Sequence, residues 1–348
     1  MPAKRSSVIA ERLLAWYDAN ARSLPWRSPP GANAADPYRV WLSEIMLQQT
    51  TVATVRPRFE SFVARWPTVE SLAAASDADL MAAWAGLGYY ARARNLIACA
   101  RAVVSEHGGR FPDTEAGLRA LPGIGDYTAA AIAAIAFGRR AVAVDANVAR
   151  VVTRLEAIAA PLPGAMPLIR IAADAMTPET RAGDFAQAMM DLGTAICTSR
   201  SPRCLLCPLM TECRAQAEGD PARYPFKAAK AARPHRYGTV FWAERDGAVL
   251  LVRRPDSGLL GGMRALPTGP WSDTPPGLAD APLDAAWRML PETVEHGFTH
   301  FTLQLALAVG ETQGHSKGEW WPVADIESAG LPTVFAKAAM TIRRARCG

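Results

Sequence analysis

The chain has 348 residues, half of them apolar, which is enough for two domains with real cores and excludes a disordered or fibrous protein. Its longest apolar stretch, residues 127–137, is too short to span a membrane. The opening sequence MPAKRSS lacks the apolar core of a signal peptide. We therefore expect a soluble cytoplasmic protein with no membrane partner.

The net charge of +5 is unevenly distributed along the chain. The first 236 residues carry a net charge of +7 and the remaining residues a net charge of −2. A polyanion such as nucleic acid would be attracted to the first part only, although a charge of this size is also ordinary for a soluble enzyme.

Helical patterns fill residues 6–217. The first helix is expected to begin at a cap formed by Ser6 and Ser7, and a second runs from the Asp36-Pro37 pair through Gln49. Apolar residues at helical spacing predict further helices over residues 52–66, 68–75, 78–85, 89–107, 114–121, 127–137, 147–158, 167–176 and 184–197.

The pattern changes after Tyr224. Residues 225–236 contain two prolines and no apolar period, which predicts a linker between a helical domain at 1–224 and a second domain at 237–348. In the second domain, strands are expected over residues 237–245, 248–254 and 298–309 and a helix over 334–346, so we predict an α+β fold there.

A local repeat occurs inside the helical domain. Residues 84–90 and 121–127 both contain Gly-aliphatic-Gly-x-Tyr between two predicted helices. Gly123 and Gly125 allow a tight hairpin whose following helix directs its free N–H groups outward, which makes a phosphate-binding site. Two ordinary helix-to-helix turns are the alternative.

Four cysteines lie within seventeen residues, at Cys197, Cys204, Cys207 and Cys213. Such crowding in an otherwise cysteine-poor cytosolic chain indicates a metal site rather than disulfides. The uneven spacing with a single CxxC pair favours a [4Fe-4S] cluster, with zinc or free thiols as alternatives.

These motifs together resemble a known family. The LPGIG hairpin, VDANV and the cysteine loop resemble the helix-hairpin-helix DNA glycosylases that carry an iron-sulfur cluster, and SEIMLQQT, GLGYYARARNL and FAQAMMDLG resemble the MutY-type adenine DNA glycosylases. The resemblance implies a mainly α, two-lobed glycosylase domain followed by a Nudix-like domain. It also implies a monomeric, bacterial-type repair enzyme at the nucleoid that excises adenine mispaired with 8-oxoguanine or guanine in duplex DNA.

Glycosidic hydrolysis needs an acid for the leaving base and an anion beside the sugar. By resemblance, Glu44 protonates adenine, Asp145 stabilises the cationic sugar, Asn147 orients its neighbours and Tyr127 supports Asp145. Taken alone, Asp145 or Asn147 could be only a helix cap. Glu44 could lie on a solvated helix face, and Tyr127 could be a packing aromatic. Relatives with lyase activity have a lysine where this chain has Tyr127, so we expect a monofunctional enzyme.

Further site residues follow from the same resemblance, because a stacked adenine must be flipped out of the duplex. Gln49 and Tyr89 match wedge positions, with Thr50 and Leu87 beside the opposite base. The residues that match an adenine pocket are Trp26, Arg27, Leu47 and Gln187. Tyr89 and Leu87 could instead be merely structural, and Trp26 could be a core residue.

The second domain resembles the Nudix-like module of this family. The acidic metal-binding helix of Nudix hydrolases is missing from it, so it should not hydrolyse nucleotides. Phe298, Thr299 and His300 match a loop that reads 8-oxoguanine, although His300 could be an ordinary surface residue. Thr299 stands where the family has serine. Two further departures are Ala146 in place of glycine and the Met263-Arg264 pair in place of an aromatic.

Two rival functions remain open on the sequence alone. A thymine or uracil mismatch glycosylase would share the scaffold, but Glu44 argues against it because a pyrimidine offers no N7 to protonate. A structural DNA-binding protein without catalysis would not need both Glu44 and Asp145.

Overall fold

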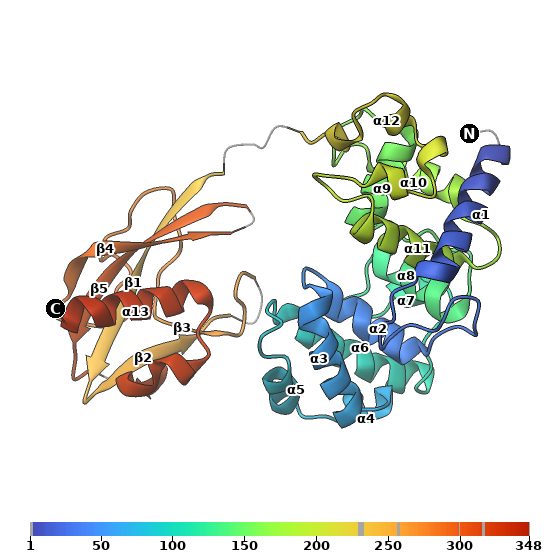
Figure 1. Cartoon of the computed structure of the whole chain (residues 1–348). Helices are drawn as coiled ribbons and strands as arrows, with labels where there is room; N and C mark the ends of the chain where they lie inside the picture. The colour runs from blue at the N-terminus through green and yellow to red at the C-terminus, as the bar shows by residue number, and fades with distance from the viewer. Residues whose placement is uncertain (1–2, 229–232, 256–257, 299, 315–316, 348) are drawn as a thin grey trace. The chain divides into compact units, whose positions relative to one another are not determined.

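The computed structural model describes residues 3–228, 233–255, 258–298, 300–314 and 317–347. The chain forms two compact units, Met1–Ala229 and Lys230–Gly348. Figure 1 shows that the first unit is built of helices and that the second contains a β-sheet. This arrangement confirms the predicted fold class.

Unit 1 follows the predicted order of helices. Its elements are α1 (Ala3–Asn20), α2 (Pro37–Leu47), α3 (Val52–Arg65), α4 (Val69–Ala73), α5 (Asp77–Ala83), α6 (Ala91–His107), α7 (Glu115–Arg119), α8 (Asp126–Phe137), α9 (Ala146–Glu156), α10 (Met166–Met176), α11 (Ala182–Ala195), η1 (Cys204–Leu206), η2 (Met210–Glu212), α12 (Arg214–Ala217) and η3 (Pro221–Arg223). Among the described residues, none of the helices is both long and apolar enough to cross a lipid bilayer.

Two separate apolar cores divide unit 1 into two lobes. The first core is formed by residues of the continuous segment from Trp26 to Ala143, joined by Ala186 of α11. The second core joins α1 to α9, α10 and α11, so both ends of the unit contribute to one lobe. Helices α2 and α8 lie in the first lobe and α9 in the second, which puts the Glu44 and Asp145 positions on different lobes.

The predicted start of the first helix is wrong. Helix α1 already includes Ala3, and Ser7 lies inside it, where its hydroxyl donates to Glu11 one turn later at 2.7 Å. In sequence, a serine that forms its hydrogen bond inside a helix looks like an N-cap, but it does not mark where the helix begins.

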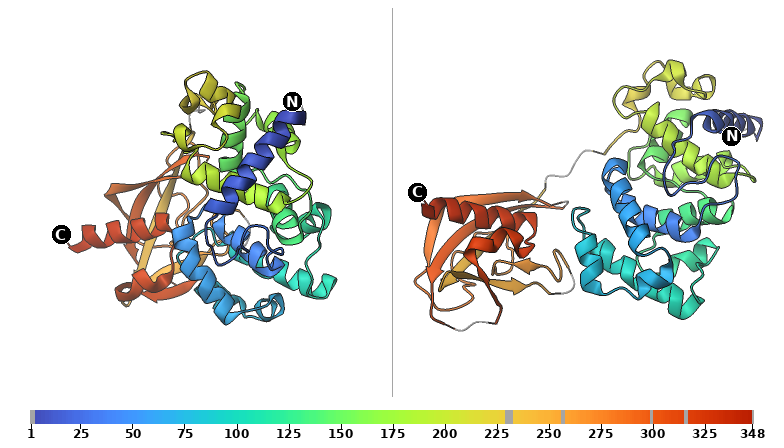
Figure 2. Two further views of the ribbon diagram at one scale, coloured as in Figure 1. Left: turned by 45° about the vertical axis from the view of Figure 1, so that its right-hand side comes forward. Right: turned by 60° about the horizontal axis from the view of Figure 1, so that its bottom comes forward.

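Unit 2 is a six-stranded sheet covered by a helix. The strands are β1 (His235–Arg245), β2 (Ala248–Arg253), β3 (Arg264–Ala265), β4 (Arg288–Gly297), β5 (Thr302–Glu311) and β6 (Glu319–Pro322). They lie in the order β3-β2-β1-β5-β4, with β6 also paired to β2. Strands β1 and β5 are parallel, whereas β2 and β4 run antiparallel to their neighbours. Helix α13 (Thr333–Cys347) packs against β4, β5 and β1, and Figure 2 shows it across one face of the sheet.

Three boundaries in this region differ from the sequence prediction, and one strand was not predicted. The strand expected from Phe298 begins at Thr302, and the preceding strand β4 was not predicted. The predicted linker is shorter at both ends, because Ala228 N donates to Leu162 O at 3.1 Å and β1 begins at His235. The segment after Tyr224 therefore first packs on unit 1.

Candidate active site

Helix α2 positions Glu44. The Asp36 carboxylate caps this helix by accepting a hydrogen bond from Tyr38 N at 2.7 Å, and Pro37 occupies its first turn. The helix is apolar and buried over most of its length, so Glu44 is only 8% exposed. The alternative of a solvated surface glutamate is wrong.

Burial changes the acidity of Glu44. Desolvation raises the pKa of its carboxyl group to about 7, and a hydrogen bond with Tyr127 together with the charge of Arg27 opposes that rise. The neighbouring Asp145 carboxylate raises it further. Glu44 can therefore carry a proton near neutral pH, as a general acid must.

Asp145 is the N-cap of α9. Its Oδ1 accepts from Val148 N at 2.7 Å and its Oδ2 from Asn147 Nδ2 at 2.9 Å. The Asn147 side-chain oxygen in turn accepts from Arg150 at 2.9 Å, and Arg150 also donates to Cys197 O at 2.8 Å. Asp145 is thus both a cap and a fixed carboxylate, whereas Asn147 is not the cap.

One cavity of about 840 Å³ in unit 1 brings most of the predicted residues together. Glu44 and Asp145 both line it, as does Ala146 at the start of α9. The other predicted residues in its wall are Trp26, Arg27, Leu47, Gln49, Thr50, Tyr127, Asn147 and Gln187. Tyr127 is half-buried there, and burial, followed by the charge of Glu44, raises its pKa well above the ordinary value.

Gln187 presents an unsatisfied amide oxygen at this cavity. Its side chain is 5% exposed, and its Nε2 donates to Gly183 O at 3.3 Å. Its Oε1 is buried and has no hydrogen-bond partner within the described part of the chain. A buried acceptor without a donor is costly, so a ligand donor at this point would be favoured.

Arg27 and Trp26 are also fixed in place. Arg27 makes two hydrogen bonds to Asp191, at 2.7 and 3.0 Å, and Trp26 packs edge-on against Phe59 at 5.1 Å. Trp26 therefore belongs to the core and lines the cavity as well.

Asp191 was not predicted from the sequence. Its side chain is 1% exposed and also pairs with Arg22 at 2.6 Å. Burial alone would raise the pKa of Asp191, but the hydrogen bonds and charges of Arg27 and Arg22 outweigh burial and lower it. Its position four residues after Gln187, on the same helix, was the available signal.

The predicted wedge residues lie in two turns with unusual backbone conformations. Gln49 has a φ of 57° and Tyr89 a φ of 49°, both in the left-handed region that side chains rarely adopt. Tyr89 is 62% exposed, whereas the Leu87 side chain is buried in the first core. Leu87 and Tyr89 do not line the cavity, so these two residues lie apart from the other predicted residues.

In the hairpin between α7 and α8, sterics explain why position 123 is a glycine. Gly123 has a φ of 75°, and a Cβ there would lie 2.6 Å from the Cβ of Asn95 on α6. Gly125 is the N-cap of α8, and within the described ranges no side chain caps that helix. The first N–H groups of α8 are therefore free of side-chain caps.

The four clustered cysteines line one small, apolar-walled cavity with Arg154. Among the described residues, no three His, Cys, Asp or Glu side chains are arranged to hold a single metal ion. All four thiols are free, and burial raises the pKa of Cys207 to about 12 and those of Cys204 and Cys213 above their ordinary value. Arg154 donates to Cys197 Sγ at 3.2 Å and to Thr198 O at 2.7 Å. Four sulfurs with cationic support fit an iron-sulfur cluster.

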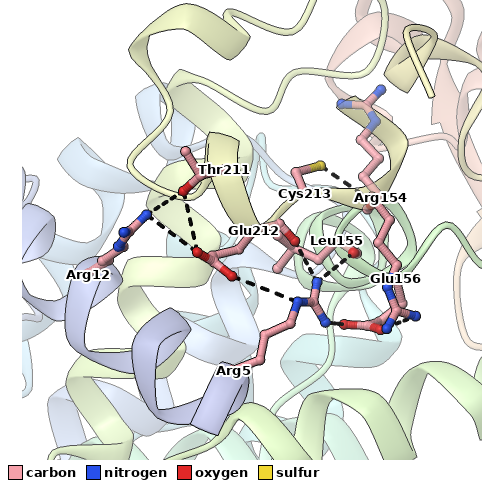
Figure 3. A network of polar contacts seen from close by, with 9 residues as sticks. Arg5, Arg12, Arg154, Leu155, Glu156, Thr211, Glu212 and Cys213 are labelled. Carbon is pink, nitrogen blue, oxygen red and sulfur yellow. Dashed lines mark hydrogen bonds and ion pairs between the residues drawn. The ribbon is translucent and has the colours of Figure 1, made fainter. Parts of the chain in front are cut away.

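Polar contacts tie this loop to the start of the chain. Figure 3 shows Arg5 reaching Glu156 and Glu212, while Arg12 reaches Thr211 and Glu212. Arg5 also donates to Leu155 O at 2.9 Å. Helix α1 therefore holds the loop against the end of α9.

In unit 2, only part of the predicted recognition loop can be described. Phe298 stacks on Trp271 with ring centroids 5.6 Å apart, and its N–H donates to Phe301 O at 2.9 Å. His300 is exposed, and Thr299 lies outside the described residues. Arg264, a departure from the family pattern, bonds Glu319 at 2.7 and 2.9 Å and so joins β3 to β6.

Both units of the chain are similar to known proteins. A family model described as "HhH-GPD superfamily base excision DNA repair protein" matches residues 42–168, and a NUDIX domain model matches residues 239–340. An adenine DNA glycosylase of Mycolicibacterium smegmatis is 43% identical over 216 residues, which are 62% of this chain and 72% of that protein. The chain belongs to the adenine DNA glycosylase family.

Two further similar proteins show how far the similarity extends. The mouse adenine DNA glycosylase is 38% identical over 75% of this chain, and the chain spans 60% of that relative's length. A thermostable thymine-DNA glycosylase has a TM-score of 0.53 and 28% identity, covering 62% of this chain and 98% of its own. The helical fold is therefore shared beyond the adenine-specific family.

Proposed function

We propose that this protein is a monofunctional DNA glycosylase that hydrolyses the bond between adenine and deoxyribose where adenine lies opposite 8-oxoguanine or guanine in duplex DNA. The observation that carries the proposal is the buried Glu44, with a pKa near 7, facing the same cavity as Asp145. Glycosidic hydrolysis needs one carboxylic acid and one carboxylate in different environments.

The chemistry follows from these two groups. Glu44 gives its proton to N7 of adenine while the bond between C1′ and N9 breaks, and the bonding electrons leave with the base. The Asp145 carboxylate, held by Val148 N and Asn147, stabilises the positive charge on the sugar. Water then adds to C1′ and gives its proton to the Glu44 carboxylate, which restores the acid.

Adenine recognition is assigned to the orphan amide oxygen. The Gln187 Oε1 has no donor among the residues that the structure describes, and the exocyclic amino group of adenine supplies one. Trp26 and Leu47 provide apolar contact for the base, and Arg27 is held at the cavity wall by Asp191. Guanine has a carbonyl oxygen at this position of the ring, which would face the Gln187 oxygen unfavourably.

DNA is expected to bind unit 1 through its turns. Gln49 and Tyr89 would fill the space left by the flipped adenine, with Thr50 and Leu87 next to the opposite base. The uncapped N-terminus of α8, after Gly123 and Gly125, would accept a phosphate.

Cys197, Cys204, Cys207 and Cys213 would hold a [4Fe-4S] cluster. When bound, the cluster supplies a rigid cross-link of the loop through four iron–sulfur bonds. Purified protein should then contain iron and sulfide in near-equal amounts. Zinc without iron in anaerobically prepared protein would contradict this assignment.

Unit 2 would read 8-oxoguanine through Phe298, Thr299 and His300. Residues 266–287 form turns and irregular structure, not the acidic helix that Nudix hydrolysis requires, so a recognition role suits this unit. A chain ending at Ala229 should still release adenine from A:G and lose its preference for A:8-oxoguanine. An unchanged ratio of single-turnover rates on the two duplexes would refute the recognition role.

The experiment that tests the function is single-turnover cleavage of matched duplexes containing A:8-oxoguanine, A:G, T:G and U:G. We expect abasic sites only at adenine, with Glu44→Gln inactive but still bound to DNA. Release of thymine or uracil, or activity of Glu44→Gln near the wild-type rate, would contradict the proposal.

A further inference from the structure

Arg92 occupies an unusual position at the start of α6. Its side chain is buried, with 9% of the residue exposed, and among the described residues no carboxylate forms an ion pair with it. A buried guanidinium without a counter-charge is expensive unless its N–H groups are satisfied. The fold supplies acceptors for the Nη1 and Nη2 groups of Arg92, whereas its buried Nε has no partner among the described residues.

The acceptors come from the two turns that carry the wedge residues. On the first turn, Arg92 donates to Ile45 O at 3.1 Å, Met46 O at 2.9 Å and Thr50 Oγ1 at 3.1 Å. The two carbonyls belong to the last turn of α2, where a helix lacks partners for its carbonyls and favours a cation.

The second turn is bound by the same guanidinium. Its Nη2 donates to Leu87 O at 2.7 Å and to Gly88 O at 3.2 Å. The guanidinium also lies over the Trp84 and Tyr89 rings, at 5.3 and 5.5 Å from their centroids. One planar, five-donor group thus joins two turns that are separate in sequence, a task to which the arginine fork is suited.

Both turns contain one residue in a strained backbone conformation. Gln49 and Tyr89 each have positive φ, and such residues persist only where their surroundings fix them. We propose that Arg92 is a positioning residue that sets the spacing of Gln49 and Tyr89, so that both side chains enter the duplex together as adenine leaves the stack. This inference rests on the proposed function, which assigns those two residues to the wedge.

The test compares Arg92→Lys with the matched control Arg101→Lys. Lysine keeps the positive charge but cannot reach both turns. Arg101 lies on the same helix, is half-exposed and pairs with Asp77 at the surface, so its replacement should leave cleavage unchanged. Single-turnover cleavage is measured on two duplexes with the same A:8-oxoguanine pair, one flanked by G:C pairs and one by A:T pairs.

Loss of the clamp should slow Arg92→Lys by about 10- to 100-fold in the G:C-flanked duplex, since several charge-assisted hydrogen bonds are lost. The loss should be several-fold smaller where A:T neighbours make unstacking easier. An equal loss of rate on both duplexes would overturn the inference, because a general defect of folding or chemistry does not depend on the flanking pairs. Full activity of Arg92→Lys would overturn it as well.

Base unstacking gives a readout without cleavage. A duplex with 2-aminopurine beside 2′-fluoro-2′-deoxyadenosine resists hydrolysis, because fluorine destabilises the cationic sugar. Its fluorescence should rise on binding wild type and Arg101→Lys and rise less with Arg92→Lys. An equal rise with Arg92→Lys would refute the clamp. A wild type that releases no adenine from any duplex would instead refute the proposed function.

A second variant protects the test if Arg92→Lys does not fold. Thr50→Val removes one acceptor of the first turn and leaves the guanidinium in place. Its loss of single-turnover rate should depend on the flanking pairs in the same way but should be smaller than that of Arg92→Lys. A Thr50→Val rate loss that ignores the flanking pairs would count against the clamp.

Discussion

Replacing Glu44 with glutamine should stabilise the protein, and the gain should grow with pH. The pKa of Glu44 is raised from 4.5 to about 7 in the folded chain, so between these values the folded state binds more protons than the unfolded state. Wild-type stability therefore falls as pH rises from about 4.5 to about 7. Glutamine has no such proton to lose.

The magnitude follows from the size of the pKa shift. One pKa unit is worth about 1.4 kcal/mol, so the cost of ionising the buried carboxyl group reaches about 3 kcal/mol at pH 8 and is about 1 kcal/mol at pH 5. The difference in unfolding free energy between Glu44→Gln and wild type should widen by about 2 kcal/mol over this range.

Urea unfolding followed by far-ultraviolet circular dichroism measures this difference, because most of the helix lies in unit 1. Both proteins are prepared with the same iron content and compared at several pH values. A difference that is independent of pH would show that Glu44 does not carry a raised pKa, and the argument for it as the acid would fail.

Other predictions follow from the same contacts. Tyr127→Phe removes a hydrogen bond that lowers the Glu44 pKa, so the fall in single-turnover rate should move to a pH above that of wild type; an unmoved limb in the pH–rate profile would contradict this. Tyr127→Lys should introduce borohydride trapping of an imine with DNA, whereas efficient trapping and strand nicking by wild type would refute a monofunctional enzyme. Asp191→Asn leaves Arg27 buried without its charge partner, and urea unfolding should register a loss of about 3 kcal/mol, with a loss below about 1 kcal/mol counting against the ion pair.

The helices of unit 1 could be predicted from local signals. Caps such as Asp36, apolar spacing and glycine turns lie within a few residues of the boundaries they set, so most of those boundaries agree with the structure to within two or three residues. The wrong boundary at the start of α1 also has a local cause, since Ser7 lies inside α1 but has the sequence pattern of a cap.

Strand β4 could not be recognised because its pattern is broken. Of its ten residues only Leu290 and Val294 are buried, and a register shift lies between Met289 and Thr293. The irregularity removes the alternation that marks a strand, and Pro291 is tolerated because β4 lies at the sheet edge.

The site divides in the same way. Glu44 and Asp145 stand in recognisable motifs, so both could be named before the cavity was known. The role of Asp191 could not be predicted from its place one turn after Gln187, because its partner Arg27 lies 164 residues earlier and only the folded chain brings the two charges together. The five acceptors of Arg92 were hidden for the same reason.

The division of unit 1 into two cores has a consequence for its biosynthesis. The lobe built from residues 26–143 is inserted between α1 and the segments that α1 packs against, which begin at Val148. A ribosome needs on the order of ten seconds to make that insertion. During this interval the residues that Ile9, Leu13 and Tyr17 pack against have not yet been made, whereas the inserted lobe can already form its own core. Helix α1 is therefore among the last helices of unit 1 to pack, and its apolar face is exposed on the nascent protein for longer than that of any helix that follows.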